Sequence, residues 1–343
     1  MAVRKTTIKD IAEAVGVSTA LVSFALNDSE KKYRVSEEMV RKIRAKADEM
    51  NYCPNSAAKS LRSGRSNTIA VLLSDISNRF FADIARRIED EASSCGITVI
   101  FGSTDENPRK LKRLIEVFIN KGVDGFIIVP CEGSEKTIGK LVEAKIPIVL
   151  IDRALPGVEV SSVTLNNRKS MSLAVNELYA QGYRKIQFVS YETTITNIMD
   201  REYGYLQAMA DLGLERESVV RKIRYTDILS QMKVLIPSML ENGAEALVFA
   251  TNRLAIDSLV VLRDEGKKIP DDVAVIAFDG SETFAFDLYY TTVSYVKQPI
   301  EKFGVEAFSI LMKLIKSGET ADCMNVVLNP ELVVFESSKG KGK

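Results

Sequence analysis

Apolar residues near the N-terminus recur at the spacing of two short amphipathic helices. Thr7 and Asp10 form a capping-box start, and the first apolar stripe consists of Ile8, Ile11, Ala12 and Val15. Gly16 can adopt the left-handed conformation that ends a helix. Ser18 can cap a second helix, whose buried face is formed by Leu21, Val22, Ala25 and Leu26. The pattern therefore predicts two helices that meet at a tight turn.

The opposite face of the second helix carries small or hydrogen-bonding side chains at Thr19, Ala20, Ser23, Phe24 and Asn27. Such side chains can lie against base edges in a major groove, where an apolar ring such as that of Phe24 can contact a thymine methyl group. Two capped helices also occur in any small helical bundle, and Phe24 could simply pack in a core. The pattern is therefore compatible both with DNA recognition and with an ordinary helical bundle.

A third helix is predicted after Ser36, with an apolar stripe at Val40, Ile43, Ala47 and Met50. Three helices can close one small core. The next segment, Y-C-P-N-S-A-A-K-S-L-R-S-G-R-S, offers about two helical turns, which is too short to be stable alone in water. It is either a helix that forms only with a partner or an interdomain linker.

From Asn67 onward, short β-branched runs alternate with amphipathic helical patterns. The runs are I-A-V-L-L, I-T-V-I-F, G-F-I-I-V-P, I-P-I-V-L-I, K-I-Q-F-V-S, E-A-L-V-F-A and V-A-V-I-A-F. The helical patterns include Phe80, Phe81, Ile84, Ala85, Ile88 and Leu111, Leu114, Ile115, Phe118, Ile119. This alternation predicts a parallel α/β fold. About ten strand candidates exceed one ordinary open sheet, so we expect two doubly wound subdomains.

Polar residues stand at the carboxyl ends of several predicted strands, where ligands bind in such folds. They are Asp75, Asp152, Ser190, Asn252 and Asp279. Because these ends meet along one edge of each sheet, the sequence predicts a polar cleft there. Any one of these side chains could instead cap the helix that follows its strand.

Charge is distributed unevenly along the chain. The 343 residues include 46 Lys and Arg and 46 Asp and Glu, but residues 1–66 hold 13 basic and 8 acidic residues. The basic end is the end with the predicted DNA-binding helices, although a solvated surface could also be basic. No apolar run reaches membrane-spanning length, and the N-terminus lacks the apolar core of a signal peptide. We therefore expect a cytoplasmic protein with no membrane partner.

The composition argues against most enzymatic chemistry. The chain contains no histidine, which is the commonest general base and metal ligand. It also lacks the glycine-rich phosphate loop, the nucleophile elbow and the dinucleotide motif. The four cysteines form no C-x-x-C pair, and we expect buried, reduced thiols at Cys53, Cys95, Cys131 and Cys323. We expect no cofactor, no metal and no catalysis; an enzyme would have to use carboxylates, lysine or cysteine.

The order of these parts closely resembles the LacI/GalR family of bacterial transcriptional regulators over nearly the whole chain. The resemblance is carried by T-I-K-D-I-A with G-V-S and V-S, N-Y-C-P-N-S-A-A-K-S-L, S-D-I-S-N-R-F-F-A-D-I, V-D-G-F-I-I-V-P, I-P-I-V-L-I-D-R, R-E-Y-G-Y and I-P-D-D-V-A-V-I-A-F-D. It implies a helix-turn-helix headpiece, a hinge helix that orders on operator DNA, and a core like the periplasmic sugar-binding proteins.

The resemblance also implies the domain boundaries. A DNA-binding headpiece is expected over residues 1–52, a hinge helix and linker over 53–66, an effector-binding and dimerisation core over 67–338, and a tail over 339–343. The core is expected to contain two subdomains. The first comprises residues 67–165 and 295–326, and the second 166–294 and 327–338.

The site residues follow from the same resemblance. Recognition of double-stranded operator DNA by a homodimer is expected to involve Thr7, Ser18, Thr19, Ala20, Ser23, Phe24, Asn27, Tyr33, Asn55, Ala58, Leu61 and Arg62, with Leu61 as a wedge in the minor groove. A small-molecule effector, sugar-like by this resemblance, is expected to contact Asp75, Phe80, Phe81, Asp152, Arg201, Asn252 and Asp279. For Phe80 and Phe81, plain core packing is the alternative.

Three positions depart from the pattern of the family: Phe24 replaces a polar residue, and Asn166-Asn167 and Asn252-Arg253 replace Asp-Asn and Asn-Asp. Arg253 could suit an anionic or uronate-like ligand, or it could point into solvent. The function expected from the resemblance is a DNA-binding regulator, most often a repressor, switched by a metabolite. A periplasmic solute-binding protein is the alternative, against which the missing signal peptide and the headpiece both argue.

Overall fold

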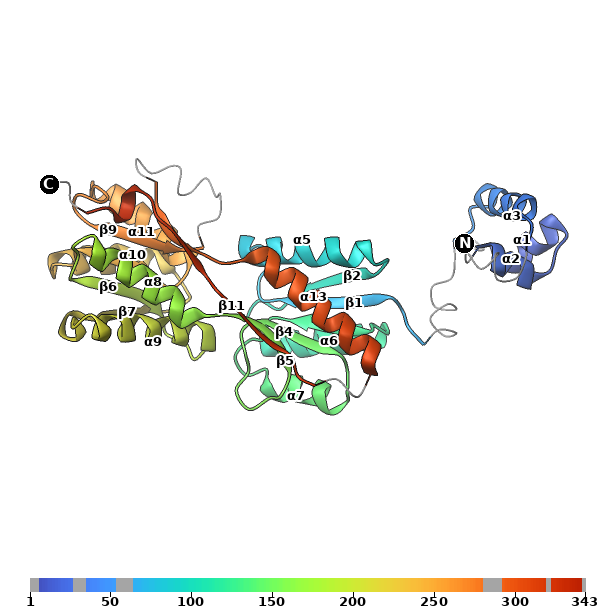
Figure 1. Cartoon of the computed structure of the whole chain (residues 1–343), viewed down its shortest axis with the longest axis horizontal. Coiled ribbons are helices and arrows are strands. Elements are labelled where there is room, and N and C mark those ends of the chain that lie inside the picture. The colour runs from blue at the N-terminus through green and yellow to red at the C-terminus, as the bar shows by residue number, and fades with distance from the viewer. Residues whose placement is uncertain (1–5, 27–34, 54–63, 280–291, 319–321, 341–343) are drawn as a thin grey trace. The chain divides into compact units, whose positions relative to one another are not determined.

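The structure is a computed structural model that describes residues 6–26, 35–53, 64–279, 292–318 and 322–340 (Figure 1). The chain divides into two compact units, Met1–Ser66 and Asn67–Lys343. The first unit has a small hydrophobic core of its own, and the second has two much larger clusters of buried side chains. Within the described residues, no helix is long and apolar enough to span a bilayer.

The first unit contains three short helices, as predicted: α1 (Ile8–Val15), α2 (Thr19–Leu26) and α3 (Glu37–Glu49). The caps are those expected from the sequence. Thr7 and Asp10 form a capping box, and Gly16 ends α1 with a φ of 78°. The backbone amide of Leu21 donates to Ser18 Oγ at 3.2 Å, and that of Met39 donates to Ser36 Oγ at 3.3 Å.

The three helices close the expected core. Its buried members are Ile11, Ala12, Val22, Ala25, Val40, Ile43 and Ala47. Arg44 of α3 donates from Nε to the carbonyl oxygen of Ala25 at 3.1 Å, so it satisfies one of the free acceptors at the end of α2. Thr6 donates to the carbonyl oxygen of Met50 at 2.8 Å and joins the N-terminal segment to the end of α3. The third helix is thereby tied to the segment before α1 and to the end of α2.

The second unit contains two six-stranded sheets, each of which forms the centre of a lobe (Figure 1). The first lobe has the strand order β11-β5-β4-β3-β1-β2, all parallel. Its strands are β1 (Thr68–Leu73), β2 (Thr98–Ser103), β3 (Gly125–Ile128), β4 (Ile148–Asp152), β5 (Ser161–Leu165) and β11 (Asn325–Leu328). Its helices are α5 (Arg79–Ser94), α6 (Pro108–Asn120), α7 (Glu135–Glu143) and α13 (Ile300–Ser317).

The second lobe repeats this plan with the strand order β12-β10-β9-β8-β6-β7, in which only the β10–β12 pair is antiparallel. Its strands are β6 (Ile186–Tyr191), β7 (Val219–Ile223), β8 (Ala246–Phe249), β9 (Ala274–Phe278), β10 (Ser294–Lys297) and β12 (Glu331–Val333). Its helices are α8 (Asn167–Ala180), α9 (Thr196–Asp211), α10 (Ile228–Glu241) and α11 (Asn252–Asp264), with short turns η1 (Glu215–Glu217) and η3 (Glu336–Ser338). The prediction of two doubly wound subdomains is confirmed.

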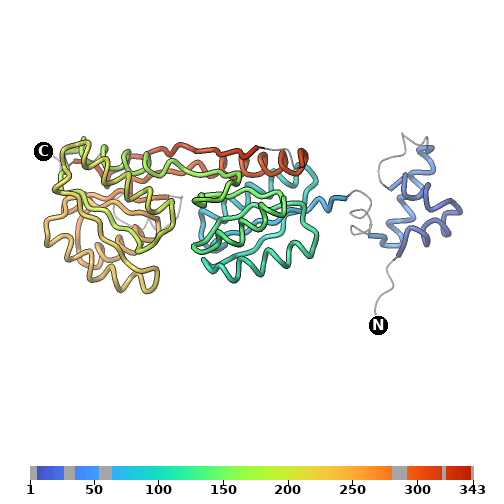
Figure 2. The backbone as a smooth tube through the Cα atoms, turned by 90° about the horizontal axis from the view of Figure 1, so that it is seen from below, coloured from blue at the N-terminus to red at the C-terminus, as the bar shows by residue number. Residues whose placement is uncertain are grey.

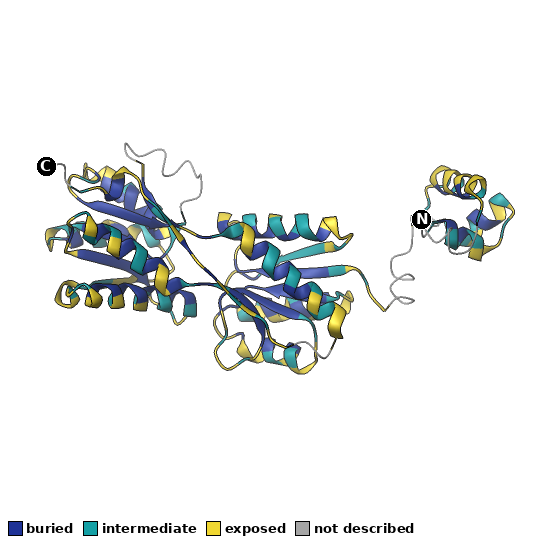
Figure 3. Cartoon of the chain, in the orientation of Figure 1, coloured by how far each residue is buried: buried dark blue, intermediate teal, exposed yellow. Residues whose placement is uncertain are grey.

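The central strands are buried on both faces, because helices cover both sides of each sheet (Figure 3). The strand β4 reads I-V-L-I-D and β9 reads A-V-I-A-F, and every residue of both is buried. A strand between two layers of helices needs apolar side chains at every position rather than at alternate ones. Six of the seven apolar runs identified in the sequence overlap buried strands of this kind; the seventh, I-T-V-I-F, overlaps the edge strand β2, in which no residue is buried.

The chain passes between the lobes three times within the described residues: after β5, after β10 and after β11. Figure 2 shows the C-terminal part of the chain, in red, running along both lobes. The exchange of segments near the C-terminus was expected, but at slightly different places. β10 pairs with β9 as far as Val296, so Tyr295 and the rest of β10 belong to the second lobe. β11 pairs with β5 as far as Leu328, so the last return lies beyond 326.

Two smaller expectations are corrected. Lys339 and Gly340 are not part of a free tail, because Tyr183 donates from its hydroxyl to the carbonyl oxygen of Lys339 at 2.7 Å and the amide of Gly340 donates to Gln181 at 2.9 Å. Of the cysteines, which are all free thiols, only Cys131 is buried; the exposed ones are Cys53, Cys95 and Cys323. These three flank or follow helices and strands at the surface, so the absence of a C-x-x-C pair did not imply burial.

Candidate functional site

One face of α2 presents the side chains that the sequence indicates for contact with bases. Thr19 and Ala20 are exposed, and Ser23 and Phe24 are partly exposed, while Val22 on the other side is fully buried. Phe24 therefore does not lie in the centre of the small core. This face is short, which suits a helix that reads a few base pairs through small side chains and one ring.

Thr7 and Ser18 are both exposed, but each already has a structural role. Thr7 Oγ1 donates to Asp10 Oδ2 at 2.8 Å in the capping box, and Ser18 Oγ accepts from Leu21. Both stand at helix N-termini, where a phosphate group is also favoured. The remaining predicted DNA contacts lie outside the described residues; these are Asn27, Tyr33, Asn55, Ala58, Leu61 and Arg62.

The seven residues predicted to contact an effector all line one cleft of about 260 Å³ in the second unit. Asp75, Phe80, Phe81 and Asp152 come from the first lobe, and Arg201, Asn252 and Asp279 come from the second. Arg253, for which the sequence left a ligand contact open, also lines the cleft. The lining residues that were not predicted are Ser74, Asn78, Glu106, Arg153, Tyr191, Asn197, Ile198, Tyr225, Ile228, Thr251 and Gln298. Both lobes therefore contribute polar and aromatic groups to a single space.

Arg201 lines the cleft and is held by contacts within the second lobe. It is 3% exposed, and it donates from Nε to Asn167 Oδ1 at 2.8 Å and from Nη1 to the carbonyl oxygen of Ala250 at 2.7 Å. Its guanidinium lies over the ring of Phe278, 3.6 Å from the ring centre. Burial lowers the pKa of Arg201, while the negative charges of Asp279 and Asp152 oppose this effect.

The position of Arg201 depends on close packing between α8 and α9. A β-carbon on Gly204, one turn after Arg201 in α9, would lie 2.6 Å from the α-carbon of Arg168 in α8. The absence of a side chain at Gly204 lets the two backbones approach, which brings Arg201 to Asn167 at the start of α8. The Arg and Gly of the R-E-Y-G-Y segment therefore act together.

Asp279 follows β9 and stands beside Gln298, which follows β10. Gln298 is 4% exposed and donates from Nε2 to both carboxylate oxygens of Asp279, at 2.7 and 2.8 Å. Burial raises the pKa of Asp279 to about 7, against the lowering effects of Arg201 and Gln298. Asp279 has a φ of 55°, a conformation that aspartate tolerates better than most residues and that strains a strand end at a site.

A second group of charges lies on the first-lobe side of the cleft. Asp152 is 3% exposed and accepts from Asn197 Nδ2 of α9 at 3.0 Å, which links the two lobes. Arg153 donates to both oxygens of Glu106, at 2.7 and 2.8 Å, and its Nε lies 3.3 Å from Asp152. Burial alone would lower the pKa of Arg153, but the hydrogen bonds to Glu106 and the charge of Asp152 outweigh it and raise the pKa.

Aromatic rings form the walls of the cleft. Tyr191 and Tyr225 are stacked with ring centres 3.9 Å apart and planes 15° from parallel. Phe80 and Phe81 contact each other edge to face at 5.0 Å, and Phe80 also contacts Phe303 of α13. Both phenylalanines are more than nine-tenths buried, so they pack in the core and line the cleft at once. The two roles proposed for them from the sequence are compatible.

The other strand-end residues divide between capping and lining. Asp75 is exposed and accepts from the amide and hydroxyl of Ser77, so it shapes the loop before α5. Thr251 rather than Asn252 caps α11, which leaves the Asn252 side chain at the cleft. Ser190 is fully buried within the second lobe and is not among the lining residues.

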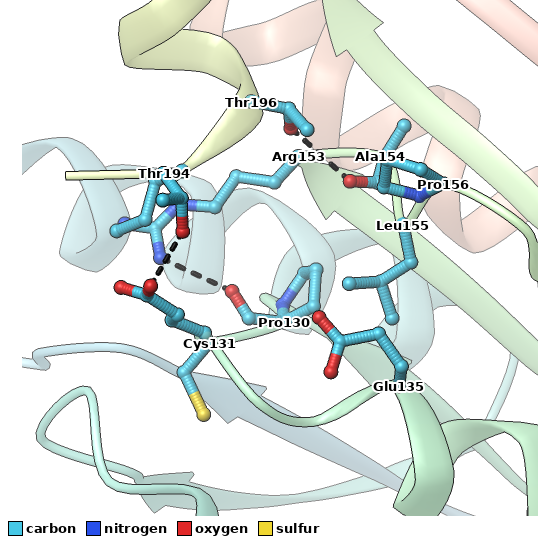
Figure 4. Close-up of a pocket in the computed structure, with 11 residues that line it drawn as sticks. Pro130, Cys131, Glu135, Arg153, Ala154, Leu155, Pro156, Thr194 and Thr196 are labelled. Atoms are coloured by element: carbon cyan, nitrogen blue, oxygen red, sulfur yellow. Dashed lines mark hydrogen bonds between the residues drawn. The ribbon is translucent and has the colours of Figure 1, made fainter.

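A smaller pocket of about 180 Å³ adjoins the cleft on the other side of Arg153. Figure 4 shows Arg153 reaching between the loop at Pro130 and Thr194. Thr196 donates to the carbonyl oxygen of Ala154 at 3.1 Å, so the start of α9 is tied to the first lobe here too. Burial raises the pKa of Cys131, which lines this pocket, to about 11. That thiol therefore stays protonated and unreactive near neutral pH.

The polar groups of the cleft suit the binding of a small polar molecule. Its charges are held by partners inside the protein, and its open acceptors are amide oxygens: Asn197 Oδ1 and Gln298 Oε1 are buried and, within the described residues, have no hydrogen-bond partner. Fixed guanidinium donors, carboxylate and amide acceptors, and aromatic walls together suit a small ligand with several hydroxyl groups.

Comparison with known proteins agrees with this architecture. The family model described as "Bacterial regulatory proteins, lacI family" matches residues 7–55, and the model described as "Periplasmic binding protein-like domain" matches residues 175–338. The first match covers α1 to α3, and the second covers most of the second lobe and the C-terminal segments. The two matches therefore fall on the two units of the chain.

Curated relatives match the chain from end to end. The HTH-type transcriptional regulator DegA of Bacillus subtilis is 30% identical over 339 residues, which are 97% of this chain and 98% of the relative. The ribose operon repressor of Halalkalibacterium halodurans is 30% identical over 338 residues, 98% of each chain. The lac repressor dimer bound to operator and the anti-inducer ONPF has the same fold, with a TM-score of 0.84 at 20% identity over 98% of this chain and 100% of that one. The chain therefore belongs to the lacI family of bacterial regulatory proteins and is a DNA-binding transcriptional regulator.

Proposed function

We propose that the protein represses transcription in the cytoplasm, as a homodimer on a near-palindromic operator, and that a small hydroxylated molecule bound in the cleft controls this activity. The observation that carries the proposal is the cleft itself. All seven side chains expected to hold an effector line one space to which both lobes contribute. The same chain carries a DNA-binding headpiece, so a solute-binding protein without a DNA function is disfavoured.

The headpiece supports the operator part of the proposal. On one face of α2, Thr19 and Ala20 are exposed and Ser23 and Phe24 are partly exposed, so bases could contact this face. Because one recognition helix reads only a few base pairs, two-fold symmetry lengthens the site that is read. Contacts between the headpiece and the phosphates of the DNA backbone would add affinity without sequence preference. The dimer is therefore the smallest assembly that would give useful specificity.

The chemistry of the cleft supports a sugar or a sugar derivative. Arg201 offers hydrogen-bond donors from a fixed plane, Asp152 and Asp279 offer acceptors, and the Tyr191–Tyr225 stack offers an apolar wall. The name of one relative, the ribose operon repressor, points to the same class of metabolism. None of these side chains needs to take part in a reaction.

Control of DNA binding would follow from the way the ligand joins the lobes. A ligand that contacts Asp152 and Asp279 together would favour one arrangement of the lobes over another, by the difference between its affinities for the two. In a dimer, that preference would change the spacing at which two headpieces can be held. The sign of the effect depends on which arrangement fits the operator.

The test is to select duplexes that the full-length protein enriches from a random library, and then to titrate the best duplex by fluorescence anisotropy. We expect saturable binding at a stoichiometry of two chains per duplex and a pseudo-palindromic consensus. A panel of neutral mono- and disaccharides is then added, and at least one is expected to change operator affinity about fivefold or more. Enrichment of no sequence would contradict the operator role, and a saccharide that bound without changing DNA affinity would contradict the control.

A further inference from the structure

The cleft is lined by more negative than positive groups. Its carboxylates are Asp75, Glu106, Asp152 and Asp279, and its guanidinium groups are Arg153, Arg201 and Arg253. The sequence left open whether Arg253 would attract an anionic ligand. The answer depends on whether any of the three cations has a free face directed at the ligand, since an anion needs a partner when it leaves water.

Two of the three cations offer little to an anion. Arg253 donates from Nε to Asp257 at 2.9 Å, one turn along α11, and its side chain is 63% exposed, so its charge is both paired and screened by solvent. Arg201 uses Nε and Nη1 within the protein and lies in the field of Asp279 and Asp152. It can still donate to a hydroxyl group.

Arg153 has the geometry of an anion site, but the site is already filled from within. Its Nη1 and Nη2 each donate to one oxygen of Glu106, the two-pronged arrangement that a guanidinium also makes with a ligand carboxylate or phosphate. The Arg153 side chain is 10% exposed, whereas that of Glu106 is 39% exposed. Glu106 is therefore the more exposed partner, and its carboxylate occupies both Nη donors of the guanidinium.

We propose that Glu106 is a specificity-determining residue of this cleft: its carboxylate occupies the anion position on Arg153, so the cleft accepts uncharged or positively charged hydroxylated ligands and excludes carboxylates and phosphate esters. This inference rests on the proposed effector role of the cleft. An anionic ligand would have to displace Glu106 or enter beside Asp152 and Asp279, where like charges oppose it.

The test measures binding of inorganic phosphate to the full-length protein by isothermal titration calorimetry, in chloride buffer of matched ionic strength. Glu106→Ala frees the Arg153 fork, and we expect it to raise phosphate affinity by about ten- to a hundredfold over wild type, as for one charge-assisted bidentate contact. The double variant Glu106→Ala/Arg153→Met is expected to bind phosphate as weakly as wild type. Any phosphate bound by the headpiece is the same in all variants and cancels.

Glu135→Ala is the matched control. Glu135 is an exposed carboxylate that lines the smaller pocket next to Arg153, so its removal changes the net charge equally without uncovering the guanidinium. We expect wild-type phosphate affinity from it. If Glu106→Ala does not fold, Glu106→Gln preserves the shape and is expected to show the same gain to a smaller extent.

Three results would overturn the proposal: no gain in the folded Glu106 variants, a gain of equal size in Glu135→Ala, or a gain that survives in the double variant. Weaker phosphate binding by the double variant than by wild type would also overturn it, because Arg153 would then already bind anions in the wild-type protein. Operator DNA plays no part in this measurement. A negative result in the phosphate measurement would not contradict the proposed repressor function. A failure to bind operator DNA would likewise not change the phosphate result.

Discussion

The backbone of Arg168 in α8 passes so close to Gly204 in α9 that a β-carbon on Gly204 would lie 2.6 Å from the Arg168 α-carbon. Real β-carbons do not approach a backbone atom so closely, so any larger residue must push the helices apart. The contact lies one residue from Asn167 and one turn from Arg201, which are joined by a 2.8 Å hydrogen bond. The close packing of α8 against α9 therefore also sets the position of Arg201 in the cleft.

Gly204→Ala is expected to destabilise the second unit by about 1–3 kcal/mol, the usual cost of overpacking a core, even though alanine favours helices. The free energy of unfolding in urea is the measurement. Gly139→Ala in α7 is the control, because a β-carbon there meets nothing within 4 Å. That variant is expected to gain roughly 0.5–1 kcal/mol from helix propensity. Equal effects of the two substitutions would mean that α8 and α9 are less tightly packed than described.

Arg201→Ala is expected to remove the response of operator affinity to ligand, because it deletes the central donor of the cleft. It also leaves Asn167 and the carbonyl of Ala250 without their donor, so the second unit should lose about 2–4 kcal/mol of stability. Ligand-free operator affinity should be about unchanged. Anisotropy with and without ligand, alongside urea unfolding, separates the two effects.

Arg253→Ala is the matched control for Arg201→Ala, since it removes an arginine that also lines the cleft but is 63% exposed. Because the substitution leaves the buried carboxylate of Asp257 without this partner, a loss of about 1–3 kcal/mol of stability is expected. A normal ligand response in Arg201→Ala, or its loss in Arg253→Ala alone, would place the binding site elsewhere.

The raised pKa of Asp279 implies that the stability of the protein depends on pH. Its pKa is about 7 in the folded protein and 3.8 for a model carboxyl group, so the folded state holds this proton more tightly. The resulting stabilisation is complete below about pH 4 and is lost as pH rises through 7. Relative to Asp279→Asn, which keeps the shape without titrating, wild type should therefore lose on the order of 2 kcal/mol between pH 4 and 8. Urea unfolding across this range measures the difference, and a constant difference would show that Arg201 and Gln298 keep the carboxylate ionised.

Thr19→Val tests the recognition face of α2. The substitution keeps the shape of an exposed side chain and removes its hydroxyl, so affinity for the selected operator should fall by about 1–3 kcal/mol while binding to random DNA stays the same. Anisotropy with both duplexes gives the two values. An equal loss on both would mean that Thr19 contacts the backbone rather than a base.

The fold was predictable wherever burial forces a continuous apolar run. The central strands could be read directly, because helices on both faces leave no place for polar residues. Three of the four edge strands, β7, β11 and β12, carry exposed residues and were not identified; β7 reads V-V-R-K-I. The fourth, β2, was identified from the run I-T-V-I-F, although none of its residues is buried. β5 and β10 lie next to edges and are short or polar, as in S-Y-V-K. The exact crossings between the lobes were displaced for the same reason.

The cleft was predictable from the polar residues at strand ends. Some lining residues were overlooked because the strands before them had not been identified. Gln298 stands at the end of β10, so it could be found only after that strand was known. Tyr191 ends β6 and Arg153 follows β4, so the strand-end rule could have included both. Glu106 and Tyr225 lie in loops, where only three-dimensional contacts show their roles. The Arg153–Glu106 pair therefore depends on the structure and not on any motif.

The exchange of strands between the lobes has a consequence for the order in which the protein folds during synthesis. The headpiece has a complete core by Tyr52, so it can fold as soon as it leaves the ribosome. Both large sheets lack an edge strand until residues 325–333 have been made, because β11 completes the first lobe and β12 the second. A chain released before residue 325 would thus carry a folded DNA-binding domain on two unfinished sheets, and cellular quality control would meet a species that can approach DNA before it can sense a ligand.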